Sequence, residues 1–383
     1  MRIFQVLAGS ANYYVKQNQT WLRNLHEPLL EMGHDVILHS ATMGTKAMRE
    51  KNPRLRARFG EILLETFKTE LKKKPIDLFF AYLMDGMVDT DVLAEIHRLG
   101  VPMVNFSCNN IHQFDLVDEI SPYFDLNLYA EKEAGIKFEK IRSKALWWPM
   151  ASNPRYFHPI RTVQNIDVSF VGANYALRAQ YIAYLLHEKI DVQVFGPYWI
   201  LDPGQPWKTP LRRWYYQFRN LFALTEQASQ TETGRLQNYL LRIALNREFP
   251  LNLHEPVTDD ELIRLYSRSK ISLGFLEVYD DHNPGKVIKR HMHLREFEAP
   301  MCGALYCTGY SNELAEMFEP EKEVITYQNK EEMLNKVRYF LHHPAEGEKI
   351  RQAGMKRALA DHTYQKRYQT LFKEMRLESR GKR

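Results

Sequence analysis

The stretch from Arg290 to Gly309, RHMHLREFEAPMCGALYCTG, holds the residues whose types and spacing best suit chemistry. Arg295 and Glu298 are three positions apart, so on a helix over residues 294–301 they would share one face. The start of such a helix offers N–H groups and partial positive charge to an anion. A carboxylate suits a ribose diol, and arginine suits a diphosphate. The stretch therefore predicts a nucleotide site, although Glu298 could also be a surface residue paired with Arg295.

The elements that must position these residues alternate between strands and helices. Thr258 followed by Glu261 forms a capping box, which predicts a helix start there. Such alternation predicts parallel, doubly wound sheets that bind ligands beyond the carboxyl ends of their strands. Strands are expected at 2–8, 35–39, 76–81, 102–106, 126–129, 167–172, 191–196, 271–276 and 304–307, and helices at 19–32, 91–99, 176–188, 312–318 and 330–342.

Three loops that follow predicted strands in the first half carry polar residues. Asp85 and His112 are the side chains there that could take a proton from a hydroxyl group. Each also has a structural interpretation, because Asp85 precedes Gly86 as turn residues do and His112 could simply pack in its loop. The other loop residues expected to line a ligand site are Gly9, Ser10, Asn109 and Asn110.

A family resemblance rests on the order Arg-x-Phe-Glu-Ala-x-x-x-Gly, which runs from Arg295 to Gly303 before a strand and is followed by Asn312-Glu313-Leu314. This order resembles the C-terminal domain of GT-B glycosyltransferases, and most of all the group typified by spore maturation protein CgeB. The segments VPMVNF, SPYFDLNLYAEKE and WWPMASNPRYFHP follow the family's order in the first half. The resemblance implies an α/β GT-B fold, with two Rossmann-like doubly wound parallel-sheet domains facing across a cleft.

The same resemblance implies a division of the chain and of its roles. Residues 1–155 would form an acceptor-side domain, with a helix at about 356–376 packing back on it, and residues 160–355 a donor domain. Glu298 would hold the donor ribose, while Arg290 stands where many retaining relatives carry a second glutamate. For Arg178 a solvated position at a helix start is the alternative. The further donor-side candidates are Arg295, Gly303, Arg178, Asn174, Lys286, Lys289, Arg290 and Glu255, the last in the turn expected beside the donor base.

The resemblance implies transfer of a sugar from a nucleotide-diphosphate sugar, with a UDP-sugar favoured over a GDP-sugar and no cofactor. Metal independence is expected, because no Asp-x-Asp follows a predicted strand and cations near Glu298 could neutralise the diphosphate. The resemblance favours retention of configuration, whereas inversion would need Asp85 or His112 as a base. The alternatives are a nucleotide-sugar epimerase or hydrolase, and a non-catalytic nucleotide-sugar-binding protein. The acceptor, whether glycan, lipid-linked glycan, protein or small molecule, is left open.

Composition narrows the protein class. The 383 residues, 44% of them hydrophobic, suit two domains, and three cysteines without metal-ligand spacing suggest reduced thiols. No run reaches the roughly 18 apolar residues of a membrane span, so a cytoplasmic protein is expected. A segment at about 200–249 is interpreted as an insertion. Its part 207–222 mixes aromatic and basic residues, which suits peripheral contact with the inner membrane face, a packed helical hairpin or, less well, nucleic acid.

Overall fold

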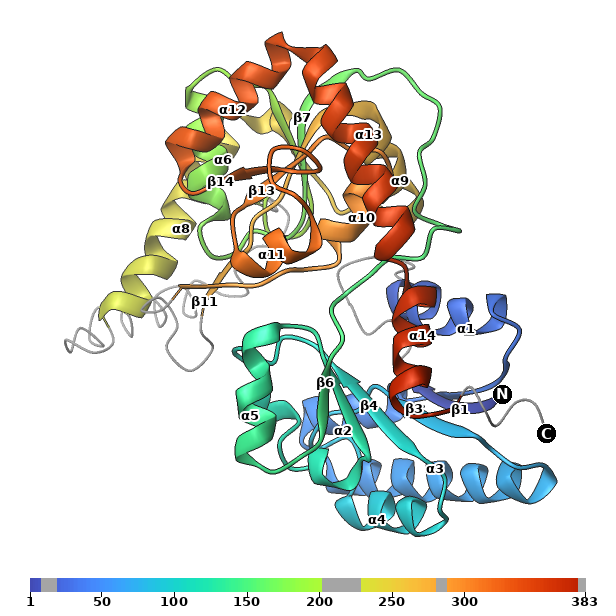
Figure 1. Cartoon of the computed structure of the whole chain (residues 1–383). Coiled ribbons are helices and arrows are strands. Elements are labelled where there is room, and N and C mark those ends of the chain that lie inside the picture. Colours follow the sequence, from blue (N-terminus) through green and yellow to red (C-terminus); the bar gives the residue numbers. More distant parts are fainter. Residues whose placement is uncertain (8–18, 202–228, 280–287, 378–383) are drawn as a thin grey trace. The chain divides into compact units, whose positions relative to one another are not determined.

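The computed structural model describes residues 1–7, 19–201, 229–279 and 288–377, which fall into two compact units (Figure 1). The first unit contains residues 1–158, 292–301 and 357–383, and the second contains residues 159–291 and 302–356. Each unit is built around one parallel sheet. None of the described helices combines the length and the apolar character that crossing a membrane requires.

The sheet of the first unit has six parallel strands in the order β2-β1-β3-β4-β5-β6. The strand order reverses at β1, which lies between β2 and β3, so ligands are expected beyond the ends of these strands. The strands are β1 (Arg2–Leu7), β2 (Asp35–Ser40), β3 (Leu78–Ala81), β4 (Met103–Ser107), β5 (Leu126–Tyr129) and β6 (Ala145–Trp147).

Helices cover both faces of this sheet (Figure 1). Asn52 caps the longest of them, α3, because its side chain accepts the N–H groups of Arg54 and Leu55 while Pro53 takes the first helical position. The helical elements grouped in this unit are the π-helix η1 (Leu22–His26), α1 (Glu27–Glu31), α2 (Thr42–Glu50), α3 (Pro53–Lys73), α4 (Thr90–Arg98), the 3-10 turns η2 (Phe114–Leu116), η3 (Ser121–Tyr123) and η4 (Lys132–Ala134), α5 (Gly135–Lys140), α10 (Arg295–Met301) and α14 (Tyr364–Glu374).

Alternating side chains of the central strands build a core on each face of the first sheet. On one face Phe4 meets Phe67 of α3 edge to face, with ring centroids 5.1 Å apart. On the other face Phe80 meets Tyr368 of α14 at 5.6 Å. This alternation follows from the two-residue period of a strand. β1 and β3 are therefore apolar apart from Arg2 and Gln5 of β1, and Gln5 Nε2 donates to the Leu25 carbonyl at 2.9 Å.

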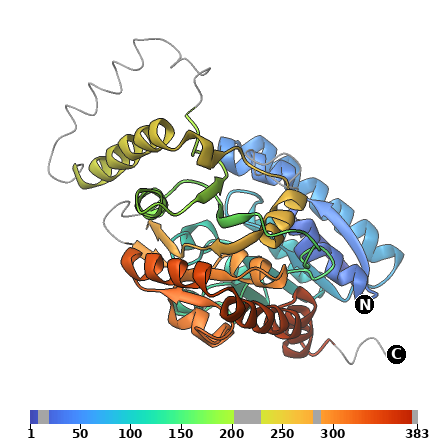
Figure 2. The same cartoon turned by 90° about the horizontal axis from the view of Figure 1, so that it is seen from above.

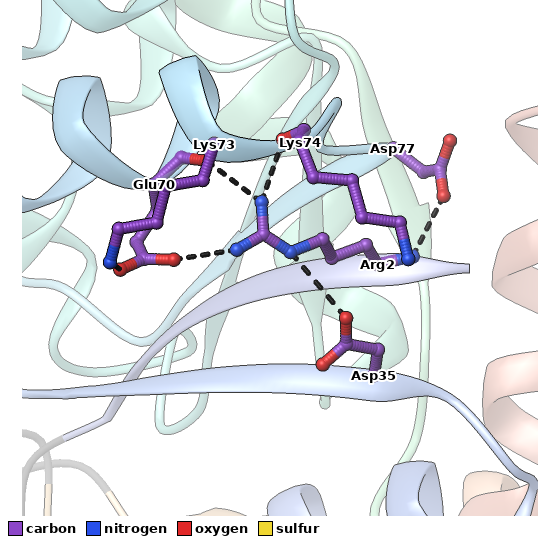
Figure 3. Close-up of polar contacts among 6 residues, drawn as sticks. All are labelled: Arg2, Asp35, Glu70, Lys73, Lys74 and Asp77. Carbon is purple, nitrogen blue, oxygen red and sulfur yellow. Dashed lines mark hydrogen bonds and ion pairs between the residues drawn. The ribbon is translucent and has the colours of Figure 1, made fainter.

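At its amino end the first sheet is tied down by Arg2 (Figure 3). The Arg2 guanidinium donates to the carbonyls of Glu70 (2.8 Å) and Lys74 (2.6 Å) at the end of α3, and to the Glu70 carboxylate at 2.5 Å. Its Nε lies 3.5 Å from Asp35 of β2, and its backbone N–H donates to Asp77 at 2.7 Å. One side chain thus connects β1, β2 and α3 at the amino ends of the strands, opposite the carboxyl ends where a ligand is expected.

The sheet of the second unit also has six parallel strands, in the order β14-β13-β10-β7-β8-β9. Its order reverses between β10 and β7, which places the expected ligand position beyond the ends of these two strands. The strands are β7 (Ile166–Val171), β8 (Val192–Phe195), β9 (Leu253–His254), β10 (Ser269–Leu273), β13 (Tyr306–Gly309) and β14 (Ile325–Tyr327).

The second unit carries its own helices, and α8, yellow in Figure 2, lies beside α6. The predicted capping box is confirmed, since Thr258 accepts the Glu261 N–H and Glu261 accepts the Thr258 N–H. The elements are α6 (Arg178–His187), α8 (Ser229–Glu248), the 3-10 turn η5 (Pro250–Asn252), α9 (Asp259–Arg268), α11 (Asn312–Met317), α12 (Lys330–His342) and α13 (Pro344–Asp361), which runs on into the first unit.

The prediction of two doubly wound parallel sheets is confirmed. Two local predictions differ from the structure. The stretch expected to be a loop after β10 contains an antiparallel hairpin of β11 (Glu277–Tyr279) and β12 (Ile288–Arg290). Residues 292–301, expected in the donor domain, group with the first unit, where Phe297 of α10 contacts His362 at 5.3 Å between ring centroids.

Candidate functional site

Arg178 holds together the two loops at the point where the second sheet reverses. Its Nη1 donates to the Ala173 carbonyl after β7 at 3.0 Å, and its Nη2 lies 3.5 Å from the Phe275 carbonyl after β10. Nη2 also donates to the Tyr175 hydroxyl at 2.6 Å, and the guanidinium stacks 3.7 Å from the Tyr175 ring centre. Arg178 is 1% exposed, so the alternative of a solvated helix-start arginine is wrong. These contacts make it a positioning residue, and a direct phosphate contact stays a prediction.

Asn174 belongs to the same loop and fastens it to the segment after β8. Its backbone N–H donates to the Pro197 carbonyl at 3.1 Å, and its amide Nδ2 donates to the Tyr198 carbonyl at 3.3 Å. Gly196, with φ +149°, permits this approach, since a Cβ there would lie 2.2 Å from the Gly172 carbonyl oxygen. The loop after β7 is therefore held against the segment after β8 by these contacts.

Arg290 is fixed at the carboxyl ends of the neighbouring strands. Its Nη1 donates to the Tyr310 carbonyl after β13 at 3.0 Å, and its Nη2 donates to the Gln328 carbonyl after β14 at 3.2 Å. Across the hairpin, Nη2 lies 3.2 Å from Oε1 of Glu277, a residue that sequence reasoning missed. Its signal was its place just after a strand, where polar side chains reach a ligand edge. The guanidinium is held in one orientation as a result.

Glu298 lies on the seven-residue helix α10 and is 5% exposed, so the alternative of a surface residue is wrong. The backbone N–H groups of Phe297 and Glu298 both donate to the Leu294 carbonyl at 2.9 Å, and Glu296 accepts the His293 N–H. Much of the helix start is thus bonded within the protein, which leaves less of it for an anion than the sequence predicted. The half-exposed Arg295 begins the helix.

Gly303 makes the turn that follows α10. Its φ is +71°, a conformation that glycine adopts without strain, and a Cβ there would lie 3.3 Å from Pro159 Cγ. Its carbonyl accepts a hydrogen bond from Arg351 Nη1 at 3.1 Å. Backbone geometry therefore favours glycine at this position, and a role in ligand contact stays a prediction.

In the first unit, the loop after β4 is held by the loop after β5. The buried Glu131 carboxylate accepts the backbone N–H groups of Asn109 (2.7 Å) and Asn110 (2.9 Å). Lys137 donates to the carbonyls of Asn110 (3.0 Å) and Ile111 (2.6 Å). Sequence reasoning missed Glu131 and Lys137, although Glu131 follows β5 closely. Asn109 and Asn110 thus present a fixed backbone, with Asn109 at φ +65°.

The two candidate bases sit in different surroundings. Asp85 accepts the backbone N–H groups of Glu119 (3.1 Å) and Ile120 (3.0 Å), so it anchors the segment before β5. Burial is the largest cause that raises the pKa of Asp85 to about 7, and Asp118 adds to the rise, whereas the two backbone bonds oppose it. His112 is 7% exposed, and its backbone N–H donates to the Asn109 carbonyl at 3.2 Å. Proton abstraction by either residue stays a prediction.

Several predicted residues contribute little geometry. Glu255 is exposed in the turn between β9 and α9. Gly9, Ser10 and Lys286 lie outside the described residues, as does the 207–222 segment. Lys289 lies on β12 and is half-buried. In the described part of the chain, no group of three or more His, Cys, Asp or Glu side chains is placed to hold a metal ion.

Comparison with known proteins decides the family. Residues 178–373, just over half of the chain, match the family described as glycosyl transferase-like. The chain belongs to this glycosyl transferase-like family. No curated protein matches it in sequence.

Several solved structures align with this glycosyl transferase-like chain over almost its whole length. Sucrose-phosphate synthase from Thermosynechococcus elongatus aligns with a TM-score of 0.62 at 13% identity, covering 98% of both chains. Anabaena HepE in complex with UDP and glucose gives 0.57 at 10% identity, covering 98% of this chain and 99% of its own. Trehalose 6-phosphate synthase from Burkholderia multivorans gives 0.59 at 9%, covering 99% and 98%. At such identities the likeness shows the fold, which is that of GT-B glycosyltransferases.

Proposed function

We propose that this protein transfers a sugar from a nucleoside-diphosphate sugar to a hydroxyl group of an acceptor, with retention of configuration and without a bound metal. The observation that carries the proposal is the family match over residues 178–373. It is supported by the similar structure of Anabaena HepE, which was crystallised with UDP and with UDP-glucose. Those ligands favour a UDP-sugar as the donor.

In this proposal the chain's own groups bind the donor and neutralise the charge of the leaving group. Glu298 accepts hydrogen bonds from the ribose diol. Arg290, Arg295 and Lys286 stabilise the negative charge that grows on the diphosphate oxygen as the bond to the sugar breaks. Arg178 and Asn174 keep the loop after β7 in shape for the diphosphate. These roles follow the family resemblance and agree with the fixed guanidinium of Arg290.

Retention needs no side-chain base. The acceptor oxygen forms its bond to the sugar on the face that the diphosphate leaves, and the departing phosphate oxygen takes the acceptor's proton. This proposal gives Asp85 and His112 structural duties, which agrees with the two backbone hydrogen bonds that Asp85 accepts. Substituting either residue should then reduce turnover by much less than the factor of about 10² to 10⁴ that a general base contributes.

Thermal unfolding with UDP, GDP and CMP, without added metal, tests the donor site. A nucleotide at a hundred times its Kd stabilises the folded state by about 2.7 kcal/mol. We expect stabilisation by UDP that Glu298→Gln abolishes, that Glu188→Gln, an exposed control, retains, and that EDTA leaves unchanged. Folded protein that no nucleotide stabilises would refute the proposed function. The anomeric configuration of the product, determined by NMR, tests retention.

A further inference from the structure

Glu277 is a buried carboxylate with fewer partners than its charge demands. It is 2% exposed, and neither of its oxygens accepts a hydrogen bond from any described residue. Among the described residues its ion-pair partner is Arg290, whose Nη2 lies 3.2 Å from Oε1. A buried carboxylate normally receives several hydrogen bonds, because an unpaired one is costly. This carboxylate has acceptor capacity that the described protein leaves unused.

The groups around Glu277 are committed to other partners. The Tyr327 hydroxyl donates to the Gly274 carbonyl at 2.6 Å. Burial, and then the negative charge of Glu277, raise the pKa of Tyr327 well above its usual value. The Arg290 guanidinium divides its donors between the Tyr310 and Gln328 carbonyls as well as facing Glu277. The arrangement therefore fixes Arg290 more fully than it satisfies the carboxylate.

Glu277 lies beyond the carboxyl ends of the strands of the second sheet, where a ligand is expected. It follows β10, and Gly309 at the end of β13 faces it. A methyl group on Gly309 would lie 3.5 Å from Oε1 and 3.8 Å from Oε2, which is ordinary contact distance. Room for a small group therefore exists beside both oxygens.

The chemistry of the pair selects the kind of group that would fit. A carboxylate accepts hydrogen bonds and repels phosphate, so the diphosphate is excluded as its partner. One carboxylate beside an arginine is also a poor cation site. Neutral hydroxyl groups are good donors to a carboxylate, and the bond is strengthened by the charge. We infer that Glu277, oriented by Arg290, binds hydroxyl groups of the donor's sugar and so determines which sugar is accepted. This inference rests on the proposed function.

Two substitutions separate this role from a structural ion pair. Glu277→Gln keeps the shape and removes the charge, whereas Gly309→Ala keeps the charge and fills the space beside the oxygens. Glu188→Gln is the matched control, since Glu188 pairs with Arg338 at 2.8 Å on the surface. Calorimetric titration of each variant with UDP and with UDP-glucose, UDP-galactose and UDP-N-acetylglucosamine, and with GDP and GDP-mannose, separates nucleotide binding from sugar binding.

We expect one nucleotide sugar to bind wild-type protein more tightly than its nucleoside diphosphate. Glu277→Gln and Gly309→Ala should each weaken that sugar complex by about tenfold to a hundredfold, as loss of hydrogen bonds to a charged group does. Neither should weaken the complex with the nucleoside diphosphate alone, because Glu277→Gln only removes a negative charge beside Arg290. Arg290 is 32% exposed and keeps its hydrogen bonds to the Tyr310 and Gln328 carbonyls in Glu277→Gln, so this substitution should change the melting temperature of the ligand-free protein little.

Different results would reject different claims. Variants that bind the nucleotide sugar as tightly as wild type, or a Glu277→Gln variant that melts well below it, would overturn the sugar-binding role and leave the proposed function standing. If no nucleotide sugar binds more tightly than its nucleoside diphosphate, the sugar-binding role is also overturned and the proposed function still stands. Wild-type protein that binds no nucleoside diphosphate would refute the proposed function and this inference with it.

Discussion

Replacing Arg178 with methionine should loosen the two loops that flank the reversal point of the second sheet. Methionine keeps an unbranched side chain but loses the bonds to the Ala173 carbonyl (3.0 Å) and the Tyr175 hydroxyl (2.6 Å), together with the stacking on Tyr175. A hydrogen bond from a charged group contributes about 1.5–3 kcal/mol and a cation–π contact about 0.5–2 kcal/mol. At about 1.5 kcal/mol for each of the two bonds and about 1 kcal/mol for the stacking, near the lower ends of these ranges, the loops should lose about 4 kcal/mol of local stability.

Amide hydrogen exchange measures this loss where it occurs. Since 1.4 kcal/mol corresponds to a factor of ten, protected amides in 172–177 and 274–276 should exchange about a thousandfold faster in Arg178→Met. Arg247→Met, which changes a side chain that is 75% exposed, should leave the same amides unaffected. Exchange within about threefold of wild type in Arg178→Met would refute the view that Arg178 positions these loops.

Three further substitutions test the framework. Arg2→Met should lower the free energy of unfolding, measured in urea, by about 3 kcal/mol, because the Glu70 and Lys74 carbonyls and the Glu70 carboxylate lose a charged donor; a loss below about 1 kcal/mol would contradict this. Folding opposes ionisation of Asp85, whose pKa rises from 3.8 to about 7, so stability from this group is greatest below about pH 4 and falls as the pH rises through 7; Asp85→Asn should flatten that dependence, and parallel profiles would show that another group causes it. Gly303→Ala should cost about 1–2 kcal/mol because of its φ of +71°, and an unchanged melting temperature would argue against it.

The sequence was sufficient for those parts of the fold that local patterns determine. The strand over 126–129 and the helix over 330–342 have the predicted bounds, and Thr258 and Glu261 form the predicted capping box. Buried parallel strands are continuous apolar runs, and capping boxes depend on residues three positions apart, so both can be seen in the chain itself. The family's order of motifs supplied the remaining topology.

The parts of the site that depend on distant acceptors could not be predicted. Arg178 is buried because the Phe275 carbonyl, nearly a hundred residues later, approaches it. The sequence around Glu277 does not indicate that Arg290 will pair with it, because a hairpin brings the two residues together. A charged residue is expected to be solvated unless its partners are known, so the sequence alone cannot decide between a buried and a solvated Arg178 and does not show that Glu277 is buried.

The chain order of the first unit has a consequence for protein synthesis. Trp148 Nε1 donates to the Arg367 carbonyl at 2.8 Å, and the Tyr368 hydroxyl donates to the Leu25 carbonyl at 2.5 Å, so α14 completes the layer that residues near the start of the chain begin. On the ribosome these early residues emerge first, but α14 cannot pack on them until the whole second unit has been synthesised. The second unit can therefore fold before the first unit is complete. A nascent chain stalled before residue 364 would expose to chaperones the aromatic surface around Phe80 and Trp148 that Tyr368 of α14 covers.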